Sequence, residues 1–226
     1  MAQPRSDKTT SDLSLRLLSA AVMIPPAIAA VYFGFPYFDI LVLIGGAILI
    51  FELYGASGKR LSWTAGGAIY VALAVVALLE IRRAETSGAL SIFWIFLLVW
   101  SADSCAYFFG RVLGGPKLAP KLSPKKTWAG FIGALIGAAI IGGALAIYLE
   151  KSTFWTLILT SSVLGAVSQG GDLLESWFKR RFHRKDMSGL IPGHGGLFDR
   201  VDGLLPVAIV CWCGEMLVDE VLLEWL

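Results

Sequence analysis

The chain has 226 residues, of which 56% are hydrophobic and 16% are charged, and its mean hydropathy is +0.71. A soluble domain is usually about 25% charged, so this composition excludes an ordinary water-soluble protein, and it also excludes a disordered chain. Three cysteines are too few for a disulfide-rich secreted scaffold, and we expect them to be packed, reduced thiols. The sequence therefore predicts an all-α, polytopic transmembrane bundle with short polar loops.

Charged residues divide the chain into seven apolar stretches. We interpret them as transmembrane helices, because only closed helices satisfy the backbone of such segments within lipid. The first stretch is too long for the apolar core of a cleaved signal peptide, so we expect it to remain as an anchor. A short extra helix near 101–115 would make eight spans, and the expected range is six to eight. The stretches cover 17–38, 40–58, 61–79, 86–102, 127–149, 152–171 and the residues from 203 onward.

The basic residues are distributed asymmetrically between the two sides of this predicted bundle. Sixteen Lys and Arg fall on the side of the N-terminus and three on the other side. Because cytoplasmic loops carry the excess of basic residues, we expect the N-terminus in the cytoplasm and the C-terminus outside. The predicted regions are a flexible cytoplasmic N-terminus over 1–12, N-terminal transmembrane helices over 13–100, and a catalytic transmembrane region with cytoplasmic loops over 101–226.

Small residues recur at four-residue spacing in the fifth stretch, at Gly133 and Gly137. Such spacing lets helix backbones approach closely. We favour packing within the bundle over a dimer contact.

A first polar cluster begins at the end of the fourth stretch. Asp103, Tyr107 and Arg111 are spaced by four residues, which places them in one polar stripe on a helix. The following loop, residues 114–127, contains prolines and glycines that prevent a continuous helix, and its four lysines could line an anionic ligand. Thr127 could cap the next helix. Alternatively, the loop is an ordinary basic loop attracted to anionic headgroups.

A second cluster lies where the sixth stretch leaves the membrane. Asp172, Glu175, Ser176 and Lys179 share one helical face, and this face changes from acidic to basic along its length. A carboxylate at the lipid boundary followed by cations one or two turns further on suits a divalent metal below a polyphosphate. A helix-end salt bridge with snorkelling lysines is the alternative interpretation.

A third cluster precedes the last stretch. Asp199 and Asp202 are three residues apart, and their oxygen ligands suit Mg²⁺. Upstream, His194 is flanked by Gly193, Gly195 and Gly196, which suggests a tight backbone turn close to a ligand. The histidine could contact a phosphate or donate a hydrogen bond that fixes the loop.

The run SWFKRRFHRKDMSGLIPGHGGLFDRVD, residues 176–202, resembles the signature of the phosphatidate cytidylyltransferase family. The segments SADSCAYFFGR (101–111) and SPKKT (123–127) are similar to that family's other motif. The resemblance is strong over 101–203, and before it only the hydropathy agrees. The chain departs from the pattern at Ala129 and Gly203, where many members carry Glu and Ser.

The resemblance implies a Mg²⁺-dependent reaction of CTP with phosphatidate that gives CDP-diacylglycerol and pyrophosphate. It implies a metal site on Asp172 and Asp199, which a K⁺ ion can share, to which we add Asp202. Relatives are polytopic, commonly homodimeric membrane proteins whose nucleotide pocket opens to the cytoplasm, so we expect a bacterial inner-membrane enzyme with no nucleic-acid partner. We assign Lys179 and Arg200 to catalysis with the two aspartates. The predicted substrate contacts are Asp103, Arg111, Ser123, Lys125, Lys126, Ser176, Arg180, Lys185 and His194.

Three other functions stay open from the sequence. A related CTP-dependent transferase could act on an archaeal ether lipid or a polyprenol. A transporter would place charges between helices but predicts paired inverted repeats, and no convincing repeat is visible in the sequence. A catalytically inactive lipid-binding protein would show no dependence on Mg²⁺ or CTP.

Overall fold

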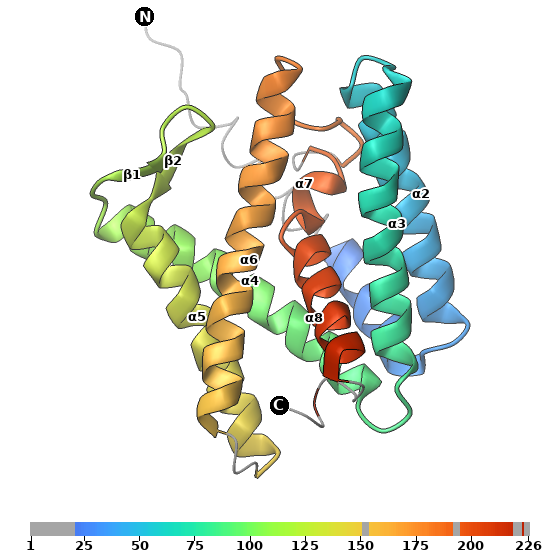
Figure 1. The fold of residues 1–226 in the computed structure, drawn as a ribbon, viewed down its shortest axis with the longest axis vertical. Helices are drawn as coiled ribbons and strands as arrows, with labels where there is room; N and C mark the ends of the chain where they lie inside the picture. Colours follow the sequence, from blue (N-terminus) through green and yellow to red (C-terminus); the bar gives the residue numbers. More distant parts are fainter. Residues whose placement is uncertain (1–20, 151–153, 192–194, 219–222, 224–226) are drawn as a thin grey trace, which may run out of the picture.

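The structure is a computed structural model that describes residues 21–150, 154–191, 195–218 and 223, and these residues form a helical bundle with one small hairpin (Figure 1). A helix over Ala21–Phe33 comes first. The labelled helices are α2 (Tyr37–Ala56), α3 (Leu61–Arg83), α4 (Gly88–Val112), α5 (Trp128–Tyr148), α6 (Phe154–Arg181), α7 (Phe198–Val201) and α8 (Leu204–Val218), and the strands are β1 (Lys117–Ala119) and β2 (Ser123–Thr127).

Five helices, α2 to α6, are long and apolar enough to cross a membrane. The helix over Ala21–Phe33 and α8 are also apolar but shorter over the described residues. These seven helices coincide with the seven predicted stretches, so the helical membrane bundle is confirmed, whereas the first and last spans stay predictions. The extra helix considered near 101–115 does not form, because α4 continues unbroken through this region to Val112.

Glycines bring α4 and α5 into close contact. A Cβ atom at Gly137 would lie 2.7 Å from the carbonyl oxygen of Ser101, and one at Gly133 would lie 2.8 Å from that of Cys105. The Ser101 hydroxyl also donates a hydrogen bond to the Gly137 carbonyl at 2.9 Å. The small residues of the fifth stretch therefore serve packing within the bundle, as expected.

The loop between α4 and α5 forms an antiparallel hairpin, in which Lys117 pairs with Thr127 and Ala119 with Ser123. The prediction that this segment is not helical is confirmed. The all-α prediction misses this hairpin. Its strands are polar and one of them contains a proline, so the sequence lacks the alternating apolar pattern of a typical strand. Thr127 caps α5 as predicted, since its Oγ1 accepts a hydrogen bond from the Gly130 amide at 3.1 Å.

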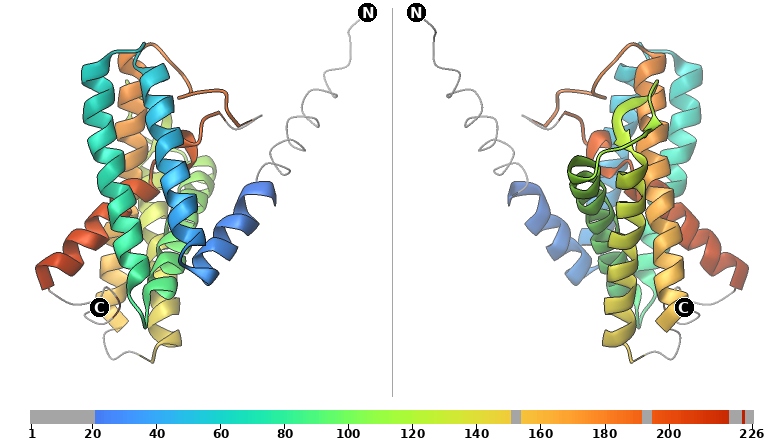
Figure 2. Two further views of the ribbon diagram at one scale, coloured as in Figure 1. Left: turned by 90° about the vertical axis from the view of Figure 1, so that its right-hand side faces the viewer. Right: turned by 90° about the vertical axis from the view of Figure 1, so that its left-hand side faces the viewer.

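The hairpin, the α2–α3 turn and the segment after α6 gather at one end of the bundle (Figure 1, top). The α3–α4 turn lies at the opposite end, so the described basic loops are distributed as the charge pattern predicted. Figure 2 shows α8 and the helix Ala21–Phe33 leaning away from the bundle on opposite sides. The short helix α7 is anchored inside, because Phe198 packs in an apolar cluster with Leu53 of α2 and Val71 of α3.

Candidate active site

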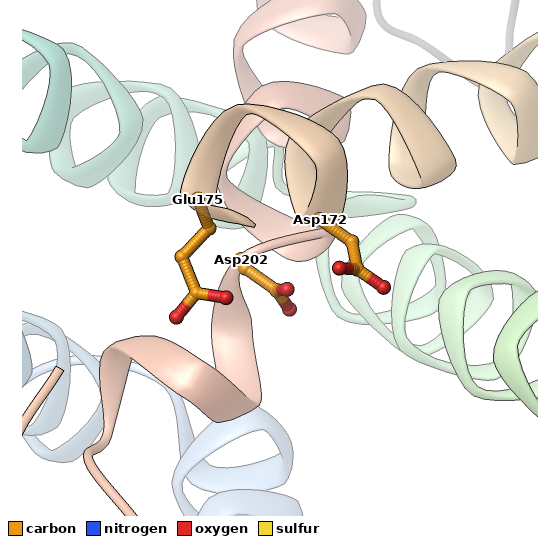
Figure 3. Close-up of side chains that lie close together, drawn as sticks. All are labelled: Asp172, Glu175 and Asp202. Carbon is orange, nitrogen blue, oxygen red and sulfur yellow. The ribbon is translucent and has the colours of Figure 1, made fainter. Parts of the chain in front are cut away.

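Three carboxylates from two segments converge in the interior of the bundle (Figure 3). Asp172 and Glu175 project from one face of α6, since residues three apart are neighbours on a helix, and Asp202 follows α7. One oxygen from each of the three lies within 4.8 Å of the others. We call Asp172, Glu175 and Asp202 the acidic cluster.

Glycines on both segments allow this convergence. A Cβ atom at Gly171 would overlap the carbonyl oxygen of Asp202, and one at Gly203 would overlap the Ser168 hydroxyl. The link between α7 and α8 therefore lies directly against α6. The glycine at 203, one of the two departures from the family pattern, fits this close contact.

The electrostatics of the acidic cluster favour a cation. Among the described residues, the buried Oε1 of Glu175 has no hydrogen-bond partner. Burial, followed by the charges of Asp172 and Asp103, raises the pKa of Asp202 to about 7. A bound cation would relieve this repulsion and would occupy the unpartnered oxygen. Three carboxylates form the all-oxygen ligand set that Mg²⁺ prefers, so the residues present fit a magnesium ion.

Asp199 lies beside the acidic cluster and makes different contacts. Its Oδ1 is 2.7 Å from the ammonium of Lys179, and its Oδ2 accepts hydrogen bonds from the Met187 and Gly196 amides, each at 2.9 Å. Although burial alone would raise the pKa of Asp199, these hydrogen bonds hold it below the ordinary value. The Lys179 ammonium also lies 2.6 Å from Oε2 of Glu175. Lys179 and Asp199 thereby fasten α7 to α6.

This arrangement differs from the predicted metal pair. The sequence analysis placed the ion on Asp172 and Asp199 with Asp202, whereas the structure groups Asp172 with Asp202 and Glu175. Asp199 does not belong to that group among the described residues. The i, i+3 spacing of Asp199 and Asp202 could not show which of the two lies closer to the carboxylates of Asp172 and Glu175.

A cavity of about 510 Å³ opens beside the acidic cluster, between α4, the hairpin and α6. Its lining is basic toward the hairpin and acidic toward α6, so it offers contacts for a charged ligand and for a metal held with it. It contains six of the residues predicted from the sequence, namely Asp103, Arg111, Ser123, Lys125, Lys126 and Asp172.

A buried glutamine links the parts of this cavity. The Lys126 ammonium lies 2.6 Å from Oδ2 of Asp172 and donates to Oε1 of Gln169 at 2.8 Å. The Gln169 amide in turn donates to Oδ1 of Asp103 at 3.1 Å. The hairpin, α4 and α6 are thus joined through one polar network, and Lys126 sits at the boundary between the carboxylates and the cavity.

The other predicted residues lie around this centre. Ser176 donates to Asp172 within α6 at 3.4 Å. The exposed Arg180 donates to the carbonyls of Leu122 in the hairpin and of Arg184, which ties the end of α6 to both neighbouring segments. Lys185 and Arg200 are exposed, and the charge of Arg200 acts on Asp103. His194 lies outside the described residues.

Sequence reasoning did not assign three residues that the structure places at or near the site. Gln169 belongs to the polar network, Glu175 to the acidic cluster, and the buried Glu52 of α2 contacts the start of α7. Gln169 and Glu52 could have been identified because each is a polar side chain within a predicted apolar stretch, where such residues are usually functional. Glu175 was named in the second polar cluster but was not assigned to the metal.

Comparison with known proteins places the chain among cytidylyltransferases. Residues 8–216 match the model of the cytidylyltransferase family. A phosphatidate cytidylyltransferase of Brucella suis is 43% identical over 171 residues, which cover 75% of this chain and 62% of the relative. That of Rickettsia bellii is 34% identical over 209 residues, with 89% and 90% covered, and that of Rickettsia conorii is 32% identical over 211 residues, with 90% and 91% covered.

The chain thus spans less than two thirds of the Brucella relative but nearly the full length of the Rickettsia relatives. The family match includes the hairpin, α6, α7 and the acidic cluster described above. Together with the signature over 176–202, it shows that the chain belongs to the cytidylyltransferase family.

Proposed function

We propose that this protein is a phosphatidate cytidylyltransferase, which transfers CMP from CTP to phosphatidate and releases pyrophosphate. The observation that carries the proposal is the acidic cluster beside a cavity edged with lysines and an arginine, within an apolar helical bundle. This combination suits a polyphosphate with its metal and a lipid phosphate. The names of the Brucella and Rickettsia relatives support the same reaction.

In this reaction, an oxygen of the phosphatidate phosphate forms a bond to the α-phosphorus of CTP. The bond from that phosphorus to the β-phosphate oxygen breaks, and the electron pair leaves with pyrophosphate. A phosphate nucleophile is already anionic near neutral pH, so the protein needs no strong general base. Its residues contribute by orienting the two phosphates and by neutralising their charges.

The acidic cluster would hold Mg²⁺ through Asp172, Glu175 and Asp202. When bound, the metal would neutralise negative charge on the CTP phosphates. We assign Asp199 to positioning α7 through Lys179 and do not assign it to direct ligation. The Lys179 ammonium supplies positive charge between Glu175 and Asp199, and a second cation such as K⁺ stays a prediction.

The cations of the cavity would bind phosphate groups. Arg111 can grip a phosphate with two parallel hydrogen bonds, and Lys125 is exposed in the hairpin at the mouth of the cavity. Lys126 would meet a phosphate next to the metal, because its ammonium already contacts Asp172. The roles of Arg180, Lys185, Arg200 and the remaining predicted contacts stay predictions.

An apolar cavity supports a lipid substrate. About 260 Å³ in volume, it lies between α3 and α6 and includes Trp63, Tyr70 and Trp177, together with Glu175 of the acidic cluster. We propose that acyl chains approach sideways between helices. By the distribution of basic loops, the active site would face the cytoplasm from a bacterial inner membrane, and the homodimer stays a prediction.

In the direct test, purified protein in detergent is incubated with phosphatidate, labelled CTP and Mg²⁺, and the amount of labelled lipid formed is measured. We expect labelled CDP-diacylglycerol from the wild-type protein and none when Mg²⁺ is chelated. Replacing phosphatidate by an archaeal ether-lipid acceptor or a polyprenyl phosphate should strongly reduce the yield. No labelled lipid from phosphatidate, or a better yield from another acceptor, would refute the assignment.

A further inference from the structure

Helix α2 contains a buried carboxylate, Glu52, that lies outside the segments resembling the family signature. Glu52 is 2% exposed and lies in the last turns of this helix, in the half of the chain that precedes the catalytic region. An ionisable side chain within an apolar span is costly and usually functional. Glu52 is not among the described residues that line the charged cavity, and we do not assign it contact with the reacting groups.

Among the described residues, the hydrogen bonds to Glu52 come from the segment that carries α7. Its Oε1 accepts from the Leu197 amide at 2.8 Å and from the Ser188 hydroxyl at 2.6 Å, and its Oε2 accepts from the Phe198 amide at 2.8 Å. The donors lie 136 to 146 positions away in the sequence. Both oxygens are therefore engaged as acceptors, and two of the three donors are backbone amides at the start of α7.

A glycine makes this approach possible. A Cβ atom at Gly196 would lie 2.7 Å from Oε1 of Glu52. The Gly196 amide meanwhile donates to Asp199. The backbone at this residue thus passes between two carboxylates, one from α2 and one from α7 itself.

The hydrogen bonds to Glu52 stabilise the start of α7, a helix that is too short to be stable by itself. With four residues, α7 is far shorter than a helix that is stable by itself, and the first amides of any helix lack partners within it. Glu52 accepts from two backbone amides at this start, and Asp202 follows directly after the last residue of α7. A shift at Leu197 and Phe198 is therefore passed on to Asp202 over a single helical turn.

We infer that Glu52 is a positioning residue that sets the metal site through α7, and the inference rests on the proposed metal-dependent function. Glu52→Gln leaves one acceptor oxygen and places a donor amide against a backbone N–H. The start of α7 then loses at least one hydrogen bond, and Asp202 no longer aligns with Asp172 and Glu175. Loss of such a supporting contact typically weakens a metal site by about 10–100-fold.

The experiment compares wild type, Glu52→Gln and Ser188→Ala, which removes one of the three hydrogen bonds. The control is Glu80→Gln, which changes an exposed glutamate of α3 that pairs with Arg83 of the same helix. Binding of Mn²⁺ as a substitute for Mg²⁺ is measured by electron paramagnetic resonance on purified, substrate-free protein. Turnover is then titrated with Mg²⁺ and, separately, with CTP.

For Glu52→Gln we expect the Mn²⁺ affinity to fall and the Mg²⁺ concentration at half-maximal turnover to rise, each by about tenfold or more. The KM for CTP should change by less than about threefold. Ser188→Ala should change both metal readouts by a few-fold in the same direction, which keeps the test decisive if Glu52→Gln does not fold. Metal readouts within twofold of wild type for the folded variants would overturn the inference. If the wild-type protein binds Mn²⁺ but forms no labelled lipid, the proposed function is contradicted. The Mn²⁺ affinities of the variants would still test the role of Glu52.

Discussion

Asp172→Asn tests the acidic cluster with the smallest change in shape. The substitution removes one of three carboxylates that lie within 4.8 Å of one another, and a neutral amide is a poor ligand for Mg²⁺ compared with a carboxylate. Metal ions contribute several kcal/mol to such reactions. We expect turnover to fall by about 100-fold or more, which is about 2.7 kcal/mol in activation free energy.

The same substitution should leave the fold nearly unchanged. The side chains of Asp172 and Lys126 are 35% and 15% exposed and their ion pair spans 2.6 Å, so solvent still screens the pair and its loss should cost about 1 kcal/mol. Lys126 also keeps its hydrogen bond to Gln169. In the opposite direction, the change removes a negative charge that disfavours ionised Asp202. The net effect on the unfolding free energy should stay within about 1 kcal/mol, a melting shift of about 2–4 °C.

The assay measures labelled lipid from labelled CTP over a range of Mg²⁺ concentrations, together with a thermal melt of each purified protein. Asp39→Asn is the matched control, because Asp39 also pairs with an arginine, Arg83, at 3.5 Å but lies near the opposite end of the bundle. It should retain turnover within about twofold. Near-wild-type turnover by Asp172→Asn at ordinary Mg²⁺ would refute the assigned metal site.

Three further predictions concern the surroundings of the acidic cluster. Lys125→Ala and Lys126→Ala should each raise the apparent KM by about tenfold, as expected for a lost charged contact to phosphate, and more than Asp172→Asn does; unchanged kinetics would leave the hairpin lysines a role in membrane topology alone. Gly171→Ala should abolish activity and lower the melting temperature, because its Cβ would overlap the Asp202 carbonyl, whereas Gly170→Ala has open space and should be neutral or stabilising by up to about 1 kcal/mol; equal melting temperatures for the two variants would contradict the close packing. Because the folded pKa of Asp202 is raised from 3.8 to about 7, its ionisation should destabilise the metal-free fold as pH rises from about 4 to about 7, and saturating Mg²⁺ should reduce this decline; melts with EDTA and with Mg²⁺ that show the same pH dependence would count against it.

The positions of the helices could be predicted because the rule that determines them is local. An apolar stretch of this length must close its backbone hydrogen bonds within itself in lipid, so the predicted apolar stretches overlap α2 to α6. Capping by Thr127 was equally predictable, since a side chain at a helix start reaches amides only two or three residues away. The hairpin was not predicted, because its polar residues carry no periodic signal.

Residue spacing also indicated which side chains share one helical face. Asp172 and Glu175 are neighbours on α6 for this reason, and the clusters of charge at 101–127, 172–185 and 199–202 contribute residues to the charged cavity and the acidic cluster. The resemblance to the family signature then indicated the class of reaction that we propose, which composition and spacing by themselves left open.

The sequence alone thus determined the membrane class, the helical segments, the basic end of the bundle and the charged residues that line the cavity. Tertiary structure decided which carboxylates meet: Asp202 joins Asp172 and Glu175, while Asp199 pairs with Lys179. It also brought Gln169 and Glu52 to partners that are 43 to 146 positions distant. The physical reason is that helix periodicity governs neighbours within one segment only. Contacts between segments depend on where glycines permit close approach and on where buried carboxylates find donors.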